Sequence, residues 1–360
     1  MALLARSLAA RGHEVSLVVP GYDGEVRTVA GVRLISGWRK GKGVRVLRSV
    51  TYRAPNLYRI LLGLQADVYY VRGRAYFTPV VMRAARRAGA VSLLGLANDK
   101  DLLEDSARLP YGLGSGPAAA IAGRLEHAYF RRGAIDAADW IITQHEGQSA
   151  LCARKGLRHL LIPNIVLVPG DRPPEDALAH DAVWVGNVHR EDRSRKGLME
   201  LVELAQRASD VRFAVAGRMS AGAAESPLAR LAALPNVTVV GSTSHDEALD
   251  LIARSRVVVN TAAWEGMSNV MLEGWALGKP TVSLSVDPNG LLSSGELGVC
   301  AGGDGRAMAA MLTELVRDEA ARREIGARCA EYVARTHSAD SVCAQYAALF
   351  DDQRHEAGAA

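Results

Sequence analysis

The chain has 360 residues, of which 49% are hydrophobic and 23% charged, and its formal net charge is +4. This length can bury the cores of two ordinary domains, and the balance is that of a soluble globular protein. No apolar run approaches the roughly 18–20 residues of a membrane span. Arginines interrupt the opening MALLARSLAARGHE, so we do not expect a signal peptide.

The cysteines and histidines point away from a metal site. The four cysteines form no CxxC pair, which favours buried free thiols in a reducing cytoplasm, and we expect a cytoplasmic protein. The nine histidines show no spacing suited to zinc.

The first half of the chain alternates apolar runs with helical patterns. It opens with a helix, ALLARSLAARG, that ends at Gly12. A doubly wound domain normally has a strand before that helix, so we expect either that the first strand lies upstream of Met1 or that the sheet is altered. Strands that are apolar throughout indicate a parallel sheet covered on both faces. The expected strands are 14–20, 32–36, 67–73, 90–96 and 140–144.

Residues 26–66 form a basic stretch. They contain nine Lys or Arg and no Asp or Glu, with Trp38, Tyr52 and Tyr58 among them. Such a stretch attracts phosphate-rich partners, either a membrane surface or a nucleic acid. A solvated basic face is an equally good interpretation, because a charge run alone is weak evidence.

Prolines crowd the segment IPNIVLVPGDRPPEDALAHD, which suits a connector between domains. The alternation then restarts, and the cleft between two such domains is the default ligand site. We expect an N-terminal Rossmann-like domain over 1–168 whose first strand is missing, a C-terminal Rossmann-like domain over 177–336, a helix over 337–351 that packs back on the N-terminal domain, and a disordered tail over 352–360. The expected strands of the second half are 182–187, 211–218, 236–242, 256–262, 280–286 and 298–303.

The stretch 264–280, WEGMSNVMLEGWALGKP, carries the strongest signal for a site. Glu265 falls at the carboxyl end of an apolar strand, and Ser268 and Asn269 are good N-cap residues for the helix that follows. The free N–H groups and dipole of that helix start favour an anion, above all phosphate. Glu273, one turn into the helix, is placed to accept hydrogen bonds from ribose hydroxyls, and Glu265 from a second polyol.

The spacing of the two glutamates is weak evidence by itself, because the chain contains 19 glutamates. A capped helix after a strand is also ordinary. The strand end, glycine, capping pair and both glutamates nevertheless converge on one position, which suits a nucleoside diphosphate sugar.

The segment EGMSNVMLEGWALGKPTV closely resembles the donor-binding signature of retaining GT-B glycosyltransferases of the family 4 type, the glycosyl transferases group 1. The likeness covers nearly the whole chain: LAARGHEVSLVV resembles the family opening, LLIPNIV the end of its first domain, and VWVGN with RKGLMELVELA the start of its second. The resemblance implies the GT-B fold, an α/β architecture of two Rossmann-like, doubly wound parallel-sheet domains facing a cleft. It also implies that the N-terminal domain over 1–168 is on the acceptor side and that the C-terminal domain over 177–336 binds the nucleotide sugar.

The resemblance also implies residue roles. Glu265 corresponds to the glutamate that contacts the donor sugar, and Glu273 to the one that holds the ribose hydroxyls. Lys196 corresponds to the basic residue that neutralises the diphosphate leaving group. Family members usually need no metal ion, so we expect no cofactor. Backbone amides for the donor would come from Gly266, Met267, Ser268, Asn269 and Val270.

The chain departs from the family pattern after its second-domain strand. An arginine commonly follows the glycine there, but Asn187 follows Gly186. Arg190 or Arg195 is our candidate replacement, and a solvated polar loop is the alternative. The glycine loop that normally precedes the first helix is also absent.

A second departure lies in the first domain. Many relatives place a histidine after the strand that matches 90–96, whereas this chain has Asn98 and Asp99. We take Asp99 as a catalytic candidate beside Glu265 and Lys196. Asp99-Lys100-Asp101 also spells the DxD pattern that binds metal in another glycosyltransferase fold, but the tandem sheets argue against that fold.

We therefore predict a retaining, hexosyltransferase-like glycosyltransferase that uses a nucleoside diphosphate sugar, with front-face attack by the acceptor hydroxyl. Its acceptor would be a sugar or a lipid-linked sugar in surface polysaccharide or glycolipid assembly, at the inner membrane face through residues 26–66, with no nucleic-acid partner. The alternatives are a non-catalytic or truncated sugar-nucleotide-binding protein, a transferase for a soluble small acceptor, and a GT-B epimerase or phosphorylase.

Overall fold

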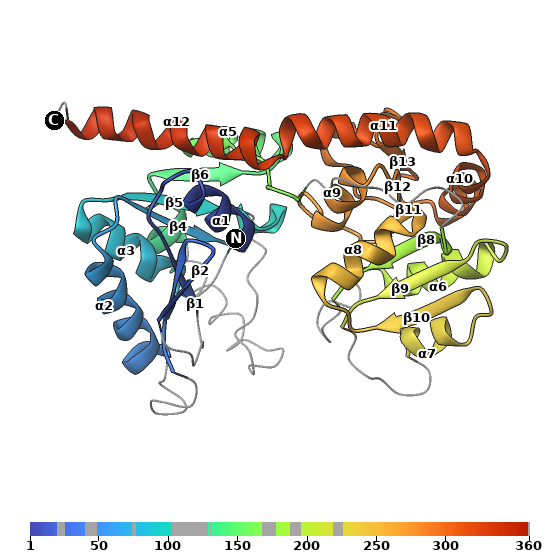
Figure 1. Cartoon of the computed structure of the whole chain (residues 1–360), viewed down its shortest axis with the longest axis horizontal. Helices are drawn as coiled ribbons and strands as arrows, with labels where there is room; N and C mark the ends of the chain where they lie inside the picture. The colour runs from blue at the N-terminus through green and yellow to red at the C-terminus, as the bar shows by residue number, and fades with distance from the viewer. Residues whose placement is uncertain are drawn as a thin grey trace. The chain divides into compact units, whose positions relative to one another are not determined.

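The computed structural model describes residues 1–19, 26–39, 49–73, 77–102, 129, 131–167, 178–187, 196–218 and 226–358. The chain divides into two compact units. Unit 1 comprises Met1–Pro163 and Val342–Ala360, and unit 2 comprises Asn164–Ser341. The chain therefore passes between the units twice, and each unit is an α/β body with its own sheet and helices (Figure 1).

The described part of unit 1 contains two sheets. The smaller has the order β1-β3-β2, with β1 (Val15–Val19) parallel to β3 (Val32–Ser36) and β2 (Arg27–Val29) antiparallel to it. The larger is parallel throughout, and β1 is not one of its strands. In pairing order its strands are β4 (Val68–Arg72), β5 (Val91–Gly95), β6 (Trp140–Thr143) and β7 (His159–Leu161).

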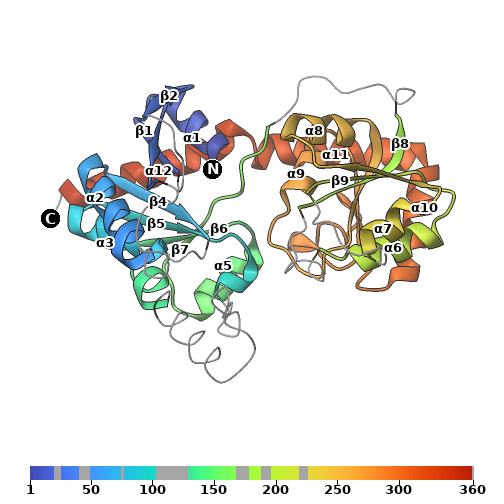
Figure 2. The same ribbon diagram turned by 90° about the horizontal axis from the view of Figure 1, so that it is seen from below.

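Helices pack on the larger sheet of unit 1, as Figure 2 shows for α2 and α3. Buried Leu57, Met82, Leu94, Ile141 and Cys152 belong to the core between them. The α-helices are α1 (Ala2–Ala9), α2 (Ala54–Leu64), α3 (Thr78–Ala88), α5 (Glu146–Arg154) and α12 (Ala339–Gly358), and the shorter turns are η1 (Ser49–Arg53), η2 (Asp99–Leu102) and η4 (Arg131–Ile135).

The last residues of the chain that the structure describes are helical. Residues 352–360 were expected to be disordered, yet α12 continues through Gly358. Its last turns, DDQRHEAG, contain no proline and several good helix formers, and the only glycine stands at the end. Earlier in α12, Tyr346 packs against Tyr70 of β4, with ring centroids 6.0 Å apart.

Unit 2 has one parallel sheet of six strands in the order β10-β9-β8-β11-β12-β13. In chain order this is 3-2-1-4-5-6, the doubly wound arrangement, and its switch point lies between β8 and β11. The strands are β8 (His180–Val185), β9 (Phe213–Ala216), β10 (Val237–Gly241), β11 (Ser255–Asn260), β12 (Thr281–Ser283) and β13 (Gly298–Cys300).

Both faces of the unit 2 sheet are buried. Ala182 and Trp184 of β8 belong to one core cluster, whereas Val183 between them belongs to another. This explains why the strands read as apolar throughout, because alternate residues point to opposite, covered faces. The covering helices are α6 (Leu198–Arg207), α7 (Pro227–Ala232), α8 (His245–Ala253), α9 (Asn269–Ala276), α10 (Gly305–Arg317) and α11 (Glu319–Thr336), with the turn η6 (Pro288–Gly290).

The predicted pair of Rossmann-like α/β units is confirmed, and a strand is present in each expected range. The doubly wound order is seen in unit 2, whereas the larger described sheet of unit 1 follows chain order. Two strands, β2 and β7, were not expected. Each has only three residues, too few for an alternating pattern to show. In the part of the chain that the structure describes, no helix combines the length and apolarity required to cross a membrane.

Candidate functional site

The switch point of the unit 2 sheet brings two predicted site segments together. β8 pairs with β11, so the loops that follow them, which contain Lys196 and Glu265, leave the same edge of the sheet. Thr261 joins the two loops. Its Oγ1 accepts a hydrogen bond from Trp184 Nε1 at 3.0 Å and donates one to the carbonyl oxygen of Lys196 at 3.1 Å.

Gly197 makes this close approach feasible. Its φ is +67°, and a Cβ atom there would lie 1.8 Å from the carbonyl oxygen of Thr261. Any other residue would force the two loops apart. Gly197 thus allows Lys196 to lie against the loop after β11. Helix α6 begins directly after Gly197, at Leu198.

Lys196 and Glu265 form an ion pair between Nζ and Oε1. The Glu265 side chain is 9% exposed and that of Lys196 is 21% exposed. Asn260 Nδ2 donates to the other oxygen of Glu265 at 3.2 Å, and Asn260 Oδ1 accepts from the backbone N–H of Ala262 at 2.8 Å. Sequence reasoning missed Asn260, although a polar residue at the end of an apolar strand was a usable signal.

The ion pair lines a pocket at the carboxyl end of β11. Its walls also include Trp184, Asn260 and Ser268. Ser268 is the N-cap residue of α9, as predicted, but its side chain makes no capping hydrogen bond within the described residues. The first N–H groups of α9 therefore keep their capacity to bind an anion.

Close packing fixes α9 in place. Met271, Leu272 and Trp275 are fully buried, and a Cβ atom on Gly274 would lie 2.5 Å from the Val258 side chain of β11. The glycine of LEG thus lets α9 approach the sheet closely. The start of α9 is accordingly set by the core of unit 2.

Glu273 lies one turn into α9, and its side chain is 15% exposed. Burial raises the pKa of its carboxyl, and His245 acts in the opposite direction. His245 Nδ1 lies 3.8 Å from Glu273 Oε1. His245 is the first residue of α8, whose start is fixed by the capping box of Ser244 and Glu247. Sequence reasoning missed His245, because only the fold brings the start of α8 to α9.

Gly186 and Asn187 follow β8. A Cβ atom on Gly217 would lie 2.1 Å from the carbonyl oxygen of Gly186, so the ends of β8 and β9 are in backbone contact. Asn187 Oδ1 accepts from the backbone N–H of Arg218 at 3.0 Å, which ties the two loops together. Arg190 and Arg195, the candidate replacements for the family arginine, lie outside the described residues.

In unit 1, the backbone of Asp99 lies in η2, and its side chain is outside what the structure describes. The neighbouring Asp101 has a structural role. Its carboxylate accepts from the backbone N–H groups of Ala97 and Asn98 at 2.7 and 3.2 Å, and from Asn98 Nδ2 at 3.1 Å. Asp101 therefore holds the turn after β5. Among the described residues, no group of three or more His, Cys, Asp or Glu is arranged to hold a metal ion.

Two family profiles match the chain. Residues 1–165 match the family described as glycosyl transferase 4-like domain, and residues 179–318 match glycosyl transferases group 1. The chain belongs to the group 1 glycosyltransferases. The resemblance noted from the sequence is thereby confirmed, and this glycosyltransferase carries a matching domain in each of its two halves. No sequence of a curated protein matches it.

Solved structures share the fold at low identity. Sucrose-phosphate synthase from Thermosynechococcus elongatus is 18% identical with a TM-score of 0.71, over 98% of this chain and 92% of that one. HepE from Anabaena, in complex with UDP and glucose, is 15% identical with a TM-score of 0.70, over 97% and 94%. These similarities confirm the predicted GT-B fold.

A variant of TarM from S. aureus, in complex with fondaparinux, α-GlcNAc-glycerol and UDP, is also similar. It is 14% identical with a TM-score of 0.62. The match covers 83% of this chain but 59% of the TarM chain, so this glycosyltransferase spans less than two thirds of TarM.

Proposed function

We propose that this glycosyltransferase transfers a sugar from a nucleoside diphosphate sugar to an acceptor hydroxyl with retention of anomeric configuration. The observation that carries the proposal is the convergence of Lys196, Glu265 and the start of α9 on the switch point of unit 2. A cation, a carboxylate and a helix N-terminus together match a diphosphate joined to a polyol. HepE and the TarM variant, which share the fold, were solved with UDP.

Each group in the site has a separable role. Lys196 binds the diphosphate, Glu265 accepts hydrogen bonds from the donor sugar, and Glu273 accepts them from the ribose. In the structure Lys196 and Glu265 neutralise each other. The donor would replace both partners at once, with phosphate oxygens against Lys196 and sugar hydroxyls against Glu265. The remaining donor contacts would come from Gly186, Asn187, Arg190, Arg195, Gly266, Met267, Ser268, Asn269 and Val270.

The reaction would proceed at one face of the donor sugar. The bond from the anomeric carbon to the diphosphate oxygen breaks, and the acceptor oxygen attacks from the same side. The acceptor proton passes to the departing phosphate oxygen. Lys196 and the α9 N-terminus stabilise the charge that develops on the diphosphate, so we propose that the reaction needs no metal ion. Asp99 is our candidate on the acceptor side.

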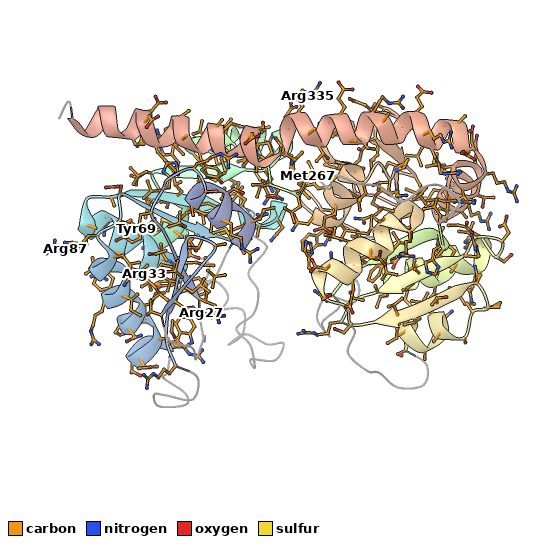
Figure 3. All side chains as sticks on the ribbon, in the orientation of Figure 1. Arg27, Arg33, Tyr69, Arg87, Met267 and Arg335 are labelled. Carbon is orange, nitrogen blue, oxygen red and sulfur yellow. The ribbon has the colours of Figure 1, made fainter. Side chains whose placement is uncertain are left out.

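The acceptor would be a sugar, most simply one carried on a lipid during surface polysaccharide or glycolipid assembly, used at the cytoplasmic face of a membrane. Support comes from the basic stretch 26–66. Arg27 and Arg33 are exposed on the neighbouring strands β2 and β3 (Figure 3). Flotation with anionic vesicles tests this location. Binding at low salt that is lost at high salt is expected, and no binding at low salt would reject it.

Donor binding is tested by thermal shift with a panel of UDP-, GDP- and ADP-sugars. The nucleotide sugars of one of the three bases should raise the Tm of the chain, and Glu273→Ala should reduce that increase. Transfer to a labelled acceptor, followed by NMR of the product anomer, then tests retention. Binding without any transfer or hydrolysis would favour the alternative, a non-catalytic sugar-nucleotide-binding protein.

A further inference from the structure

Asn164 is the first residue of unit 2 after the chain leaves unit 1. It is 7% exposed and is the asparagine of the segment LLIPNIV, although sequence reasoning gave it no role in the site. Its Nδ2 lies 3.4 Å from the carbonyl oxygen of Met267 and 3.4 Å from Oδ1 of Asn269. These residues stand on either side of Ser268, the N-cap of α9. One amide group thus bridges the turn that leads into the helix.

Asn164 is itself held by a second buried residue, His337. The Asn164 carbonyl accepts a hydrogen bond from His337 Nδ1 at 2.7 Å, and the backbone N–H of Val166 donates to the His337 carbonyl at 3.0 Å. His337 is fully buried and lies between α11 and α12. The ring of Tyr332 packs beside it at 5.4 Å between centroids. Two hydrogen bonds to His337 therefore hold the first residues of unit 2, at Asn164 and at Val166.

The protonation state of His337 fits this arrangement. A carbonyl faces Nδ1, so Nδ1 carries the proton of a neutral ring. Burial lowers the pKa of the imidazole to about 4. Nε2 has no hydrogen-bond partner within the described part of the chain. The ring therefore acts as a fixed, neutral donor to Asn164.

A buried asparagine can also serve the fold alone, and Asn236 of unit 2 shows that case. Its Nδ2 donates to the carbonyls of Ala205, Ala208 and Val211 at 3.0, 3.1 and 3.0 Å, which closes the turn after α6. Asn164 differs in what it holds, because the Met267 carbonyl and Asn269 Oδ1 belong to the α9 entry turn. The amides of that turn are the groups proposed to bind the diphosphate.

We propose that Asn164 is a positioning residue for the donor: it fixes the Met267–Asn269 turn, and His337 fixes Asn164. The inference rests on the proposed function and extends it to residues outside the donor-binding set. Anion binding by backbone N–H groups demands that several of them point at one place, so a small rotation of the turn would weaken donor binding. Neither residue need touch the donor.

The test compares Asn164→Ala with Asn236→Ala as a matched control in the full chain. The probe is whichever of UDP, GDP and ADP stabilises the wild-type chain. Asn164→Ala should weaken nucleotide binding and raise the donor KM roughly 3- to 10-fold, the size of one or two lost hydrogen bonds, with a smaller effect on kcat. Asn236→Ala should lower Tm but leave nucleotide affinity and KM at wild-type values.

His337 provides a second, independent variant. His337→Asn keeps a side-chain N–H donor for the Asn164 carbonyl and should retain more nucleotide affinity than His337→Phe, which has none. If Asn164→Ala does not fold, the order of these two affinities decides. Equal nucleotide affinity and KM in the wild type, Asn164→Ala and both His337 variants would overturn the inference alone. A wild-type chain that binds none of the three nucleotides would overturn the proposed function together with it.

Discussion

Lys196 and Glu265 are paired across the switch point of the unit 2 sheet, on loops that follow two different strands. In the proposed function, Lys196 binds the diphosphate of the donor and Glu265 accepts hydrogen bonds from the sugar hydroxyls. The positions of both depend on the Thr261 hydroxyl and the Gly197 turn, not on sequence proximity. The juxtaposition of Lys196 and Glu265 is thus a property of the sheet topology.

Replacing Lys196 by alanine should lower kcat about 100- to 1000-fold, because a donor to developing negative charge is removed. Lys196→Arg keeps the charge and should retain more activity. Turnover of the nucleotide sugar is the measurement. Lys155→Ala, which removes an exposed lysine of unit 1, is the control and should match the wild type. Equal turnover in Lys196→Ala and Lys155→Ala would contradict the role.

Replacing Gly197 by alanine should disrupt the site. The new Cβ atom would collide with the Thr261 carbonyl oxygen, which adds a steric cost to the strain of a positive φ. Gly302→Ala is the matched control, since its φ is +59° but nothing lies within 4 Å of its Cβ position. We expect Gly302→Ala to cost about 1 kcal/mol of unfolding free energy and Gly197→Ala at least about 2. Similar losses in the two variants would show that the loops can separate freely.

Donor binding should depend on pH through Glu273. Burial raises the pKa of this carboxyl, so protonation begins at a higher pH than for an ordinary glutamate. Only the carboxylate accepts hydrogen bonds from both ribose hydroxyls, and binding should therefore weaken as pH falls through the raised value. His245→Ala removes the neighbour that lowers the pKa of Glu273 and should move that decline to higher pH. Calorimetric titration with the bound nucleotide, over about pH 4.5–7.5, measures both curves.

The raised pKa of Glu273 affects the pH dependence of folding stability in the opposite direction from donor binding. A raised folded pKa means that the contribution of this carboxyl to stability is fully present below its unfolded pKa and is lost as pH rises through the folded value. Glu273→Gln should remove that loss. A stability profile with the same slope in the wild type and Glu273→Gln would refute this account.

The contribution of His337 to stability depends on pH in the opposite direction from that of Glu273. Its pKa falls from an ordinary 6.5 to about 4 through burial, so the unfolded chain binds the extra proton first as pH drops. Stability should be constant above the ordinary value and fall by about 2 kcal/mol between pH 7 and pH 5. His337→Asn should flatten this slope. Denaturant unfolding of the full chain at the two pH values, followed by a signal from unit 2, provides the measurement.

The sequence predicted the parts of this protein that depend on local pattern. The strand at 32–36 was placed to the residue, because it is bounded by Gly31 and Gly37. The helix of WEGMSNVMLEGWALGKP was placed through its N-cap and glycine signals. Contacts between distant residues were beyond such reasoning. Asn164 meets Met267 across 103 positions, and Thr261 meets Lys196 across 65, so only the folded sheet reveals them.

Three neighbouring strands, β10, β9 and β8, end in or run directly into Gly241, Gly217 and Gly186. Gly186 N–H donates to the Ala216 carbonyl at 3.0 Å, and Gly217 N–H donates to the Gly241 carbonyl at 2.7 Å. This margin of the sheet is built of main chain alone, and a Cβ atom on Gly217 would strike its neighbour. Any change of ligand preference along this margin must therefore arise in the flanking loops, through altered length or conformation.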